Sequence, residues 1–238
     1  MNKRQINKIK KIDELLVEYF GIPARKEDSD PVDMMIGTIL SQNTNDNNSY
    51  KAFKQLKEKY PNWEMLENIE EEEEIEEVIR VAGLPKQKAA AIKNFVKTIK
   101  NKFGEIDLTE YSKMNELDAV KELSTMKGIG VKTASCVLLF SFKKNICPVD
   151  THVHRTLNRI GLVKTSSPEK TFWEINQNFP ENIAHQFHTN LIKLGRTHCV
   201  KNPKCGNCPL KRICKFPEKT KEKLNLKQKD SFLLLDNI

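Results

Sequence analysis

The sequence predicts an all-α fold, and three observations support this prediction. Apolar residues recur every three or four positions along most of the chain, as Ile9, Ile12 and Leu16 do, which places them on one face of a helix. No segment shows the sustained alternation of apolar and polar residues that is typical of a half-buried strand. Short turns containing glycine or proline separate the periodic stretches, and such turns end one helix before the next begins.

Start and stop signals place the individual helices. The first spans residues 7–20 and is closed by Gly21, a residue type common just after a helix. Asp30 precedes a proline and opens the next helix as its capping residue. Further helices are expected near residues 46–59, 72–81, 86–102, 115–126, 131–142, 151–160, 168–178 and 181–194. The apolar run 136–140 resembles a strand, but the length of the stretch that contains it favours a helix.

Composition indicates a soluble globular protein with a polyanionic partner. The 238 residues are 38% hydrophobic and 30% charged, and the net charge is +8, which favours binding to nucleic acid. No apolar run approaches the roughly 20 residues of a membrane span, and the N-terminus lacks the apolar core of a secretory signal. We therefore expect a cytoplasmic protein without a membrane partner. The charged tail from residue 217 is expected to be loosely ordered, with an apolar end suited to docking on the body or on a partner.

A cysteine quartet near the C-terminus predicts a metal centre. Cys199, Cys205, Cys208 and Cys214 are separated by five, two and five residues, so one short loop can bring all four sulfurs together. In a reducing compartment, clustered cysteines indicate metal binding and not disulfides. Four thiolates suit either a zinc ion or an iron–sulfur cluster. The other two cysteines, at 136 and 147, are interpreted as ordinary core thiols.

A glycine-containing turn between two apolar stretches predicts a second functional feature. A helix ends at Met126, and a new helix starts after Gly128, Ile129 and Gly130. The glycines permit a tight turn and a close approach of a ligand, while Ile129 can fill the gap between the helices. Amides at the start of the second helix would form an anion site. The pattern predicts a helix–hairpin–helix that grips DNA phosphate, and an ordinary helical turn is the alternative.

Lys132 is the only charged residue in the apolar stretch from Val131 to Phe142. It lies one residue inside the helix N-terminus, where both burial and the helix dipole disfavour a positive charge. This position favours a neutral, nucleophilic amine. A lysine that extends to solvent or contacts phosphate is the alternative.

Asp150 occupies the position of a helix N-cap after Pro148 and Val149. Capping is its simplest role, but a carboxylate near a lysine amine is also the partner that acid–base chemistry needs. His152 follows on the first turn of the same helix.

Three features follow one another along the chain: the glycine turn with Lys132, the segment from Pro148 to His152, and the cysteine quartet. In this order they resemble the endonuclease III branch of the helix–hairpin–helix (HhH-GPD) DNA glycosylases. The resemblance covers about residues 28–216. It implies two helical domains flanking a DNA-binding cleft, with the hairpin in a six-helix barrel at 28–145. The second domain, from 1–27 and 146–216, would carry a four-iron, four-sulfur (4Fe-4S) cluster on the cysteine loop, and 217–238 would be a charged tail.

The resemblance also implies a role for each matching residue. Lys132 matches the catalytic lysine, which attacks the sugar of a flipped nucleotide, and Asp150 matches the catalytic aspartate. Such an enzyme is both a base-excision-repair DNA glycosylase and an apurinic/apyrimidinic (AP) lyase, here for oxidised pyrimidines. The resemblance also implies DNA-binding roles for five residues. The hairpin glycines Gly128 and Gly130 would bind the backbone, and Gln42 would contact the strand opposite the flipped nucleotide. Leu84 would enter the space that this nucleotide leaves, and His152 would line the base pocket.

Two alternatives to this activity stay open. The chain could be a related glycosylase for mismatched thymine or alkylated purine, or a non-catalytic DNA-binding module whose cluster senses redox state. Either way, the expected partner is double-stranded DNA with damaged bases or abasic sites, bound by a monomer associated with the nucleoid. The first cysteine gap has five residues where the family usually has six, and zinc is the alternative occupant.

Overall fold

The structure is a computed structural model that describes residues 1–25, 29–225 and 238. These residues form helices and turns and contain no strand, so the predicted all-α fold is confirmed. The chain divides into two compact units. The hairpin unit comprises residues 25–144 and 232–238, and the cysteine-loop unit comprises residues 1–24 and 145–231.

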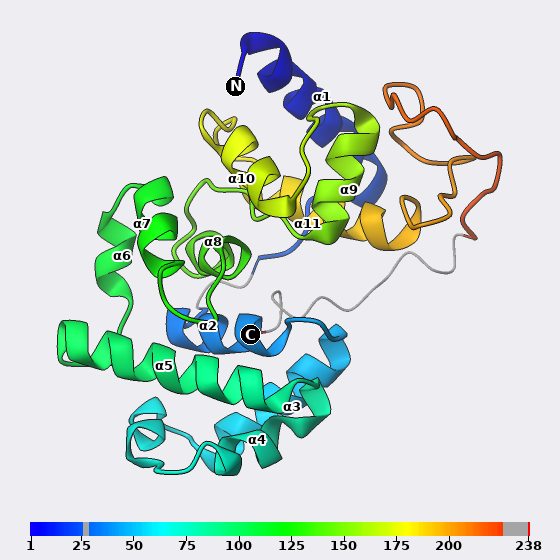
Figure 1. Cartoon of the computed structure of the whole chain (residues 1–238). Helices are drawn as coiled ribbons and strands as arrows, with labels where there is room; N and C mark the ends of the chain where they lie inside the picture. Colours follow the sequence, from blue (N-terminus) through cyan, green and yellow to red (C-terminus); the bar gives the residue numbers. More distant parts are fainter. Residues whose placement is uncertain (26–28, 226–237) are drawn as a thin grey trace. The chain divides into compact units, whose positions relative to one another are not determined.

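The hairpin unit is organised around a buried helix, α8. Its α-helices are α2 (Pro31–Leu40), α3 (Asp46–Lys59), α4 (Glu73–Ile79), α5 (Pro85–Phe103), α6 (Thr109–Lys113), α7 (Glu116–Leu123) and α8 (Val131–Phe140), joined by the 3-10 turns η1 (Trp63–Asn68) and η2 (Arg80–Ala82). Helix α8 packs against α2 and α7, and α5 packs against α4 and α2 (Figure 1). Every residue from 133 to 140 is buried, as expected for an apolar helix that neighbours enclose.

Helix ends follow the local signals. Asp30 accepts hydrogen bonds from the amides of Val32 and Asp33 and so caps α2, and α3 has the predicted bounds. The sequence did not predict η1 or α6, which are short and bury few side chains; α6 buries Tyr111 alone. Such short elements carry too few residues for a periodic pattern.

The cysteine-loop unit is built on α11 (Ala184–Thr197), which packs against α9 (Thr151–Ile160) and α1 (Lys3–Phe20) (Figure 1). The remaining helix, α10 (Pro168–Asn176), packs against α9. Lys8 on α1 donates to the carbonyls of Ile160 and Gly161, at 2.8 and 3.0 Å. A cation at the C-terminal end of α9 satisfies carbonyls that the helix leaves unpaired.

The described part of the tail, for which the sequence predicts loose order, is hydrogen-bonded to the cysteine loop. The amide of Gly206 donates to the carbonyl of Glu222 at 2.6 Å, and Asn207 exchanges two hydrogen bonds with the backbone of Leu224. A side chain at Gly206 would lie 2.5 Å from the carbonyl oxygen of Lys221. Residues 217–225 therefore form a strap against the cysteine loop.

The apolar residues 232–235 lie outside the described residues. The terminal Ile238 is buried in the hairpin unit and packs on Gly37 of α2. Within the described ranges, no helix is both long enough and apolar enough to span a bilayer.

A buried lysine ties together two chain segments of the hairpin unit. Lys88 on α5 is 2% exposed, and its Nζ donates to the carbonyls of Leu40 at 2.8 Å and Ala82 at 2.7 Å. These carbonyls end α2 and η2, where backbone acceptors lack partners within the element itself. Burial lowers the pKa of Lys88 to about 8, because apolar surroundings disfavour the charged amine.

We expect Lys88→Met to alter the pH dependence of stability. The pKa of Lys88 is about 8 in the folded protein against 10.5 for an ordinary lysine, so between these values the unfolded chain binds the extra proton. Wild-type stability therefore gains from Lys88 as the pH rises through this window. Between pH 7 and pH 10 the gain is about 2 kcal/mol. The neutral amine keeps two N–H donors for its two carbonyls.

Urea unfolding at pH 7 and pH 10 measures the effect. The stability difference between wild type and Lys88→Met should grow by about 2 kcal/mol in favour of wild type. Lys97→Met, which alters an exposed lysine on the same helix, is the control and should follow wild type. The same pH dependence in all three proteins would contradict the lowered pKa.

Candidate active site and cysteine-lined pocket

The hairpin between α7 and α8 depends on Gly128. Its φ is +88°, in the left-handed region where a side chain is strained. A Cβ there would also lie 2.4 Å from the Cβ of Ala91 on α5. Ile129 is 3% exposed and fills the gap between the helices, as predicted. Gly128 thus allows the hairpin to pack directly on α5.

Gly130 differs from Gly128 because the fold itself does not require it. It is the N-cap of α8 with φ −96°, which any residue adopts. It is exposed, and a Cβ built on it meets no atom within 4 Å. The open space lies at the N-terminus of α8, where free amides and the helix dipole favour an anion. The missing side chain leaves room for a ligand such as a backbone phosphate.

Lys132 lies beside this anion site and beside a turn from α2. Its side chain is partly buried, and its Nζ lies 3.5 Å from Oγ of Ser41. The next residue, Gln42, donates from Nε2 to the carbonyl of Gly128 at 3.1 Å and to Oγ1 of Thr133 at 3.4 Å. The structure thus brings together Lys132, Gln42 and the hairpin, three features that the sequence singled out separately.

Leu84 is held in an unusual exposed position. It is 43% exposed and has left-handed backbone angles, φ 52° and ψ 45°. Such angles cost about 1–3 kcal/mol for a residue other than glycine, and the following proline disfavours helical angles further. Leu84 is therefore not a core residue, and its apolar side chain is presented to solvent at a strained turn.

Lys88 supports both turns of this site, and sequence reasoning missed it. Its amine binds the carbonyl of Leu40, directly before Ser41, and that of Ala82, two residues before Leu84. The available signal was a lysine one turn into a helix at a position aligned with apolar residues such as Ala91 and Ile92. Periodicity shows such a position to be buried, but it does not show which carbonyls the amine reaches.

Asp150 and His152 belong to the cysteine-loop unit. Asp150 is the N-cap of α9, and its Oδ1 accepts the amide of Val153 at 2.8 Å. His152 is partly buried, and its Cβ packs on Gly195 of α11. Its Nδ1 lies 3.1 Å from Nη2 of Arg155.

Arg155 is an internal brace and is not arranged as a phosphate contact. Its Nε donates to the carbonyl of Cys199 and its Nη2 to that of Gly195, both at 2.8 Å. Arg159, one turn later, donates to the carbonyls of Val200 and Lys201. Two arginines of α9 thus fix the backbone where the cysteine loop begins.

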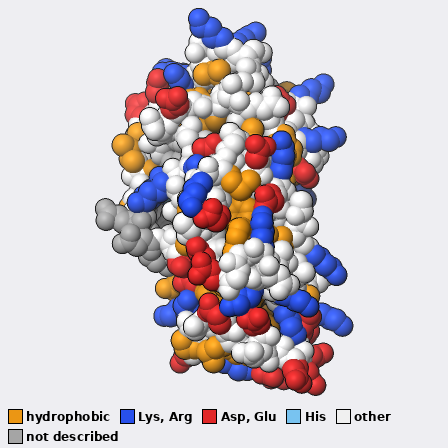
Figure 2. All heavy atoms as spheres, turned by 90° about the vertical axis from the view of Figure 1, so that its left-hand side faces the viewer, with side chains coloured by type: hydrophobic (Ala, Val, Ile, Leu, Met, Phe, Trp, Pro, Cys, Tyr) orange, Lys and Arg blue, Asp and Glu red, His pale blue; other side chains and the backbone are white. Residues whose placement is uncertain are grey.

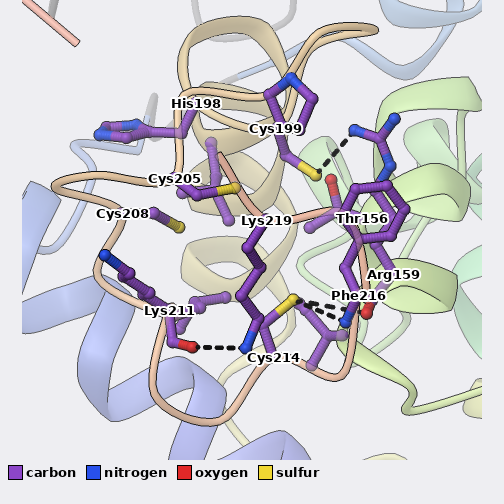
Figure 3. A pocket seen from close by; sticks show the side chains of 14 residues that line it. Thr156, Arg159, His198, Cys199, Cys205, Cys208, Lys211, Cys214, Phe216 and Lys219 are labelled. Atoms are coloured by element: carbon purple, nitrogen blue, oxygen red, sulfur yellow. Dashed lines mark hydrogen bonds between the residues drawn. The ribbon is translucent and has the colours of Figure 1, made fainter. Parts of the chain in front are cut away.

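The four cysteines of the quartet line one pocket. Figure 3 shows their sulfur atoms turned toward the interior of this pocket. Nη1 of Arg159 lies 3.7 Å from Sγ of Cys199, and the amide of Phe216 donates to Sγ of Cys214 at 3.5 Å. Burial, together with the neighbouring thiols, raises the pKa of Cys208 to about 12. A metal centre would reverse this by displacing the protons, since thiolates are the ligands.

The donor set of the pocket suits a metal centre. Four thiolates can bind a tetrahedral zinc ion or an iron–sulfur cluster. All four cysteines of the quartet line the same pocket. The chemistry of these donors therefore fits a centre that is held by cysteine alone.

The cysteine loop is the most uniformly basic segment of this unit. Residues 199–216 contain no acidic residue, and their exposed basic residues are Lys201, Lys211, Arg212 and Lys215. On the face shown in Figure 2, by contrast, lysine and arginine are interspersed with aspartate and glutamate. A basic loop fixed by α9 and by the strap suits a phosphate backbone.

Known DNA repair proteins are similar to this chain. Residues 36–181 match the family described as HhH-GPD superfamily base excision DNA repair protein. Endonuclease III of Thermotoga maritima is 34% identical over 195 residues, which is 82% of this chain and 87% of that protein.

Two solved structures share the fold. A trapped endonuclease III–DNA covalent intermediate is 27% identical with a TM-score of 0.73, covering 90% of this chain and 96% of that chain. A thermostable thymine-DNA glycosylase is 22% identical with a TM-score of 0.72, covering 90% and 98%; at this identity the likeness concerns the fold alone.

The two hairpin glycines should respond differently to alanine. Gly128→Ala should lower the free energy of unfolding by about 2 kcal/mol or more, because φ is positive and the Cβ of Ala91 is too close. Gly130→Ala should lower the free energy of unfolding by less, about 0.5–1 kcal/mol, because alanine is a poorer N-cap than glycine. It should weaken DNA binding, because its methyl group occupies the space at the N-terminus of α8. Denaturant unfolding and fluorescence anisotropy with an abasic-site duplex measure the two effects. Full DNA affinity in Gly130→Ala would contradict a phosphate site there.

Proposed function

Since the chain belongs to the HhH-GPD superfamily of base excision DNA repair proteins and is a DNA glycosylase of the endonuclease III type, we propose that it is also an AP lyase and removes oxidised pyrimidines. The observation that carries the proposal is Lys132. Its amine lies at the N-terminus of a buried apolar helix, beside the hairpin and 3.5 Å from Ser41. A glycosylase that activates water needs no amine at this position.

Recognition begins with phosphate binding at the hairpin and extrusion of the damaged nucleotide. Free amides at the start of α8 bind a phosphate of the DNA backbone. The damaged base then leaves the stack, because its glycosidic bond is inaccessible inside a duplex. Leu84 enters the vacated space. Its exposure and its strained backbone angles suit an apolar side chain held ready before DNA arrives. Gln42, already bound to the hairpin carbonyl, contacts the strand opposite the lesion.

Lys132 then performs the covalent chemistry. After it has given up a proton, its amine attacks C1′ of the flipped nucleotide, the glycosidic bond breaks, and the base leaves with a proton. Loss of the amine proton and opening of the sugar ring give a Schiff base. The imine acidifies C2′, a proton is removed there, and the C3′–O bond breaks, so that the 3′ phosphate departs. Asp150 assists by accepting a proton and stabilising the cationic sugar.

We further propose a 4Fe-4S cluster on Cys199, Cys205, Cys208 and Cys214. The four cysteines that line one pocket support it, because four thiolates are the donor set of such a cluster. When bound, the cluster supplies a rigid anchor at four points of the loop and a redox-active centre. The arginines of α9 hold the loop backbone, and its exposed basic side chains face solvent, where they can bind phosphate.

The lesion class separates this proposal from a related glycosylase. Mismatched thymine and alkylated purine are the two alternative lesions. A panel of duplexes, each with one lesion, distinguishes them. Release of oxidised pyrimidines such as thymine glycol supports the proposal, whereas release of only mismatched thymine or alkylated purine would contradict the assigned substrate.

Borohydride trapping on abasic-site DNA tests the role of Lys132. We expect a covalent protein–DNA adduct with wild type and none with Lys132→Ala, because borohydride reduces the Schiff base to a stable amine. Lys127→Ala, which removes an exposed lysine of the same hairpin, should still be trapped. If Lys132→Ala still formed the covalent adduct, another residue would be the nucleophile. No trapping even in wild type would favour a non-catalytic DNA-binding module.

Cys208→Ser should lose the bound iron and the brown visible absorbance, because one of four ligands is removed. Cys136→Ala, in which a buried thiol of the hairpin unit is altered, should keep both. Iron, zinc and sulfide analysis of anaerobically purified protein measures the occupant. Stoichiometric zinc without iron in the wild type would refute the cluster.

A further inference from the structure

The wall of the cysteine-lined pocket contains a buried hydroxyl that the protein does not use. Thr156 on α9 lines the pocket and has no exposed surface (Figure 3). Its Oγ1 is inaccessible to solvent and makes no hydrogen bond within the described part of the chain. A buried hydroxyl without a partner is unfavourable, and this one lies in the wall of the pocket that the four cysteines line.

Two other buried helical threonines of this unit bond to their own helix. Oγ1 of Thr171 donates to the carbonyl of Ser167 at 3.1 Å, and Oγ1 of Thr197 to that of Lys193 at 2.7 Å. This backward bond is the usual solution for a threonine inside a helix. Thr156 does not make it, so its hydroxyl proton is available to an occupant of the pocket.

Thr156 lies on the same face of α9 as Arg159, whose side chain points toward a cysteine sulfur. Arg159 lies three residues later, on the same helix face, and its Nη1 is 3.7 Å from Sγ of Cys199. The polar groups of two other lining residues have partners: His198 contacts Thr197 and Tyr19, and Lys219 donates to the carbonyl of Lys211. Thr156 is therefore a hydroxyl donor still available on this wall.

We propose that the hydroxyl of Thr156 donates a hydrogen bond to a sulfur of the bound cluster and raises its reduction potential. The inference rests on the proposed 4Fe-4S cluster. Hydrogen bonds to cluster sulfurs stabilise the more negative, reduced state and are one of the main determinants of the potential. The acceptor is either a cysteine Sγ or an inorganic sulfide, since both are electron-rich sulfurs and present the same chemistry to a donor.

Thr156→Val tests this inference because it removes the hydroxyl while keeping the shape of the side chain. We expect full iron loading and a midpoint potential shifted to a lower value in protein-film voltammetry. Thr156→Ser keeps the hydroxyl and should restore the potential toward that of wild type. Thr189→Val is the matched control: Thr189 is also buried on a helix of this unit with an unpaired Oγ1, but it does not line the pocket. It should leave the potential unchanged.

The outcomes separate this inference from the proposed cofactor. Full iron with an unchanged potential in Thr156→Val would overturn the role of Thr156 and leave the cluster intact. Stoichiometric zinc in the wild type would overturn the cluster, and the role of Thr156 with it. If the valine variant does not load iron, Thr156→Ala takes its place, and an unchanged potential in that loaded variant counts against the inference in the same way.

Discussion

The buried amine of Lys88 is the interaction on which the arrangement of the hairpin unit depends. It joins the last carbonyl of α2 to the last carbonyl of η2, and each of these precedes a functional turn. The turn after α2 carries Gln42, and the turn after η2 carries Leu84. One helical turn beyond Lys88, Ala91 packs on Gly128 of the hairpin. Helix α5 thus fixes from one side the three turns that we propose to contact DNA, and residues placed this way are held more precisely than residues on independent loops.

In the other unit, the cysteine loop is likewise held by hydrogen bonds from distant parts of the chain. Arg155 and Arg159 bind the backbone carbonyls around Cys199, while the strap at 217–225 holds Gly206 and Asn207. The loop is therefore held at its start and near its middle by protein groups, and its four thiols line one pocket. A loop organised in this way loses less conformational entropy when a metal centre forms and when DNA binds.

The first turns of two helices position the groups that we propose to be catalytic. Asp150 caps α9 through one carboxylate oxygen, and capping fixes the position of its side chain. Lys132 lies in the first turn of α8, is partly buried and has its amine 3.5 Å from Oγ of Ser41. In each unit the helix N-terminus provides the geometry, and the proposed reaction uses the group that it orients.

The sequence by itself determined what depends on near neighbours in the chain. Periodicity gave the all-α fold, Asp30 and Asp150 marked helix starts, and the two glycines, Lys132 and the cysteine quartet identified the family. These signals are local because capping, turn conformation and ligand spacing involve residues within a few positions of one another.

Only the tertiary structure decided which distant groups meet. It showed Lys88 bound to the carbonyl of Leu40, Arg155 committed to the backbone of Cys199, and the order of the strap at 217–225, which composition alone had suggested was loose. In the structure, Leu84 is exposed to solvent, and the hydroxyl of Thr156 in the pocket wall has no hydrogen-bond partner among the described residues. The physical reason is that burial and hydrogen-bond satisfaction are properties of the packed chain. A lysine, an arginine or a threonine has the same chemistry in any sequence, and its partner is chosen only when segments far apart in the chain pack together.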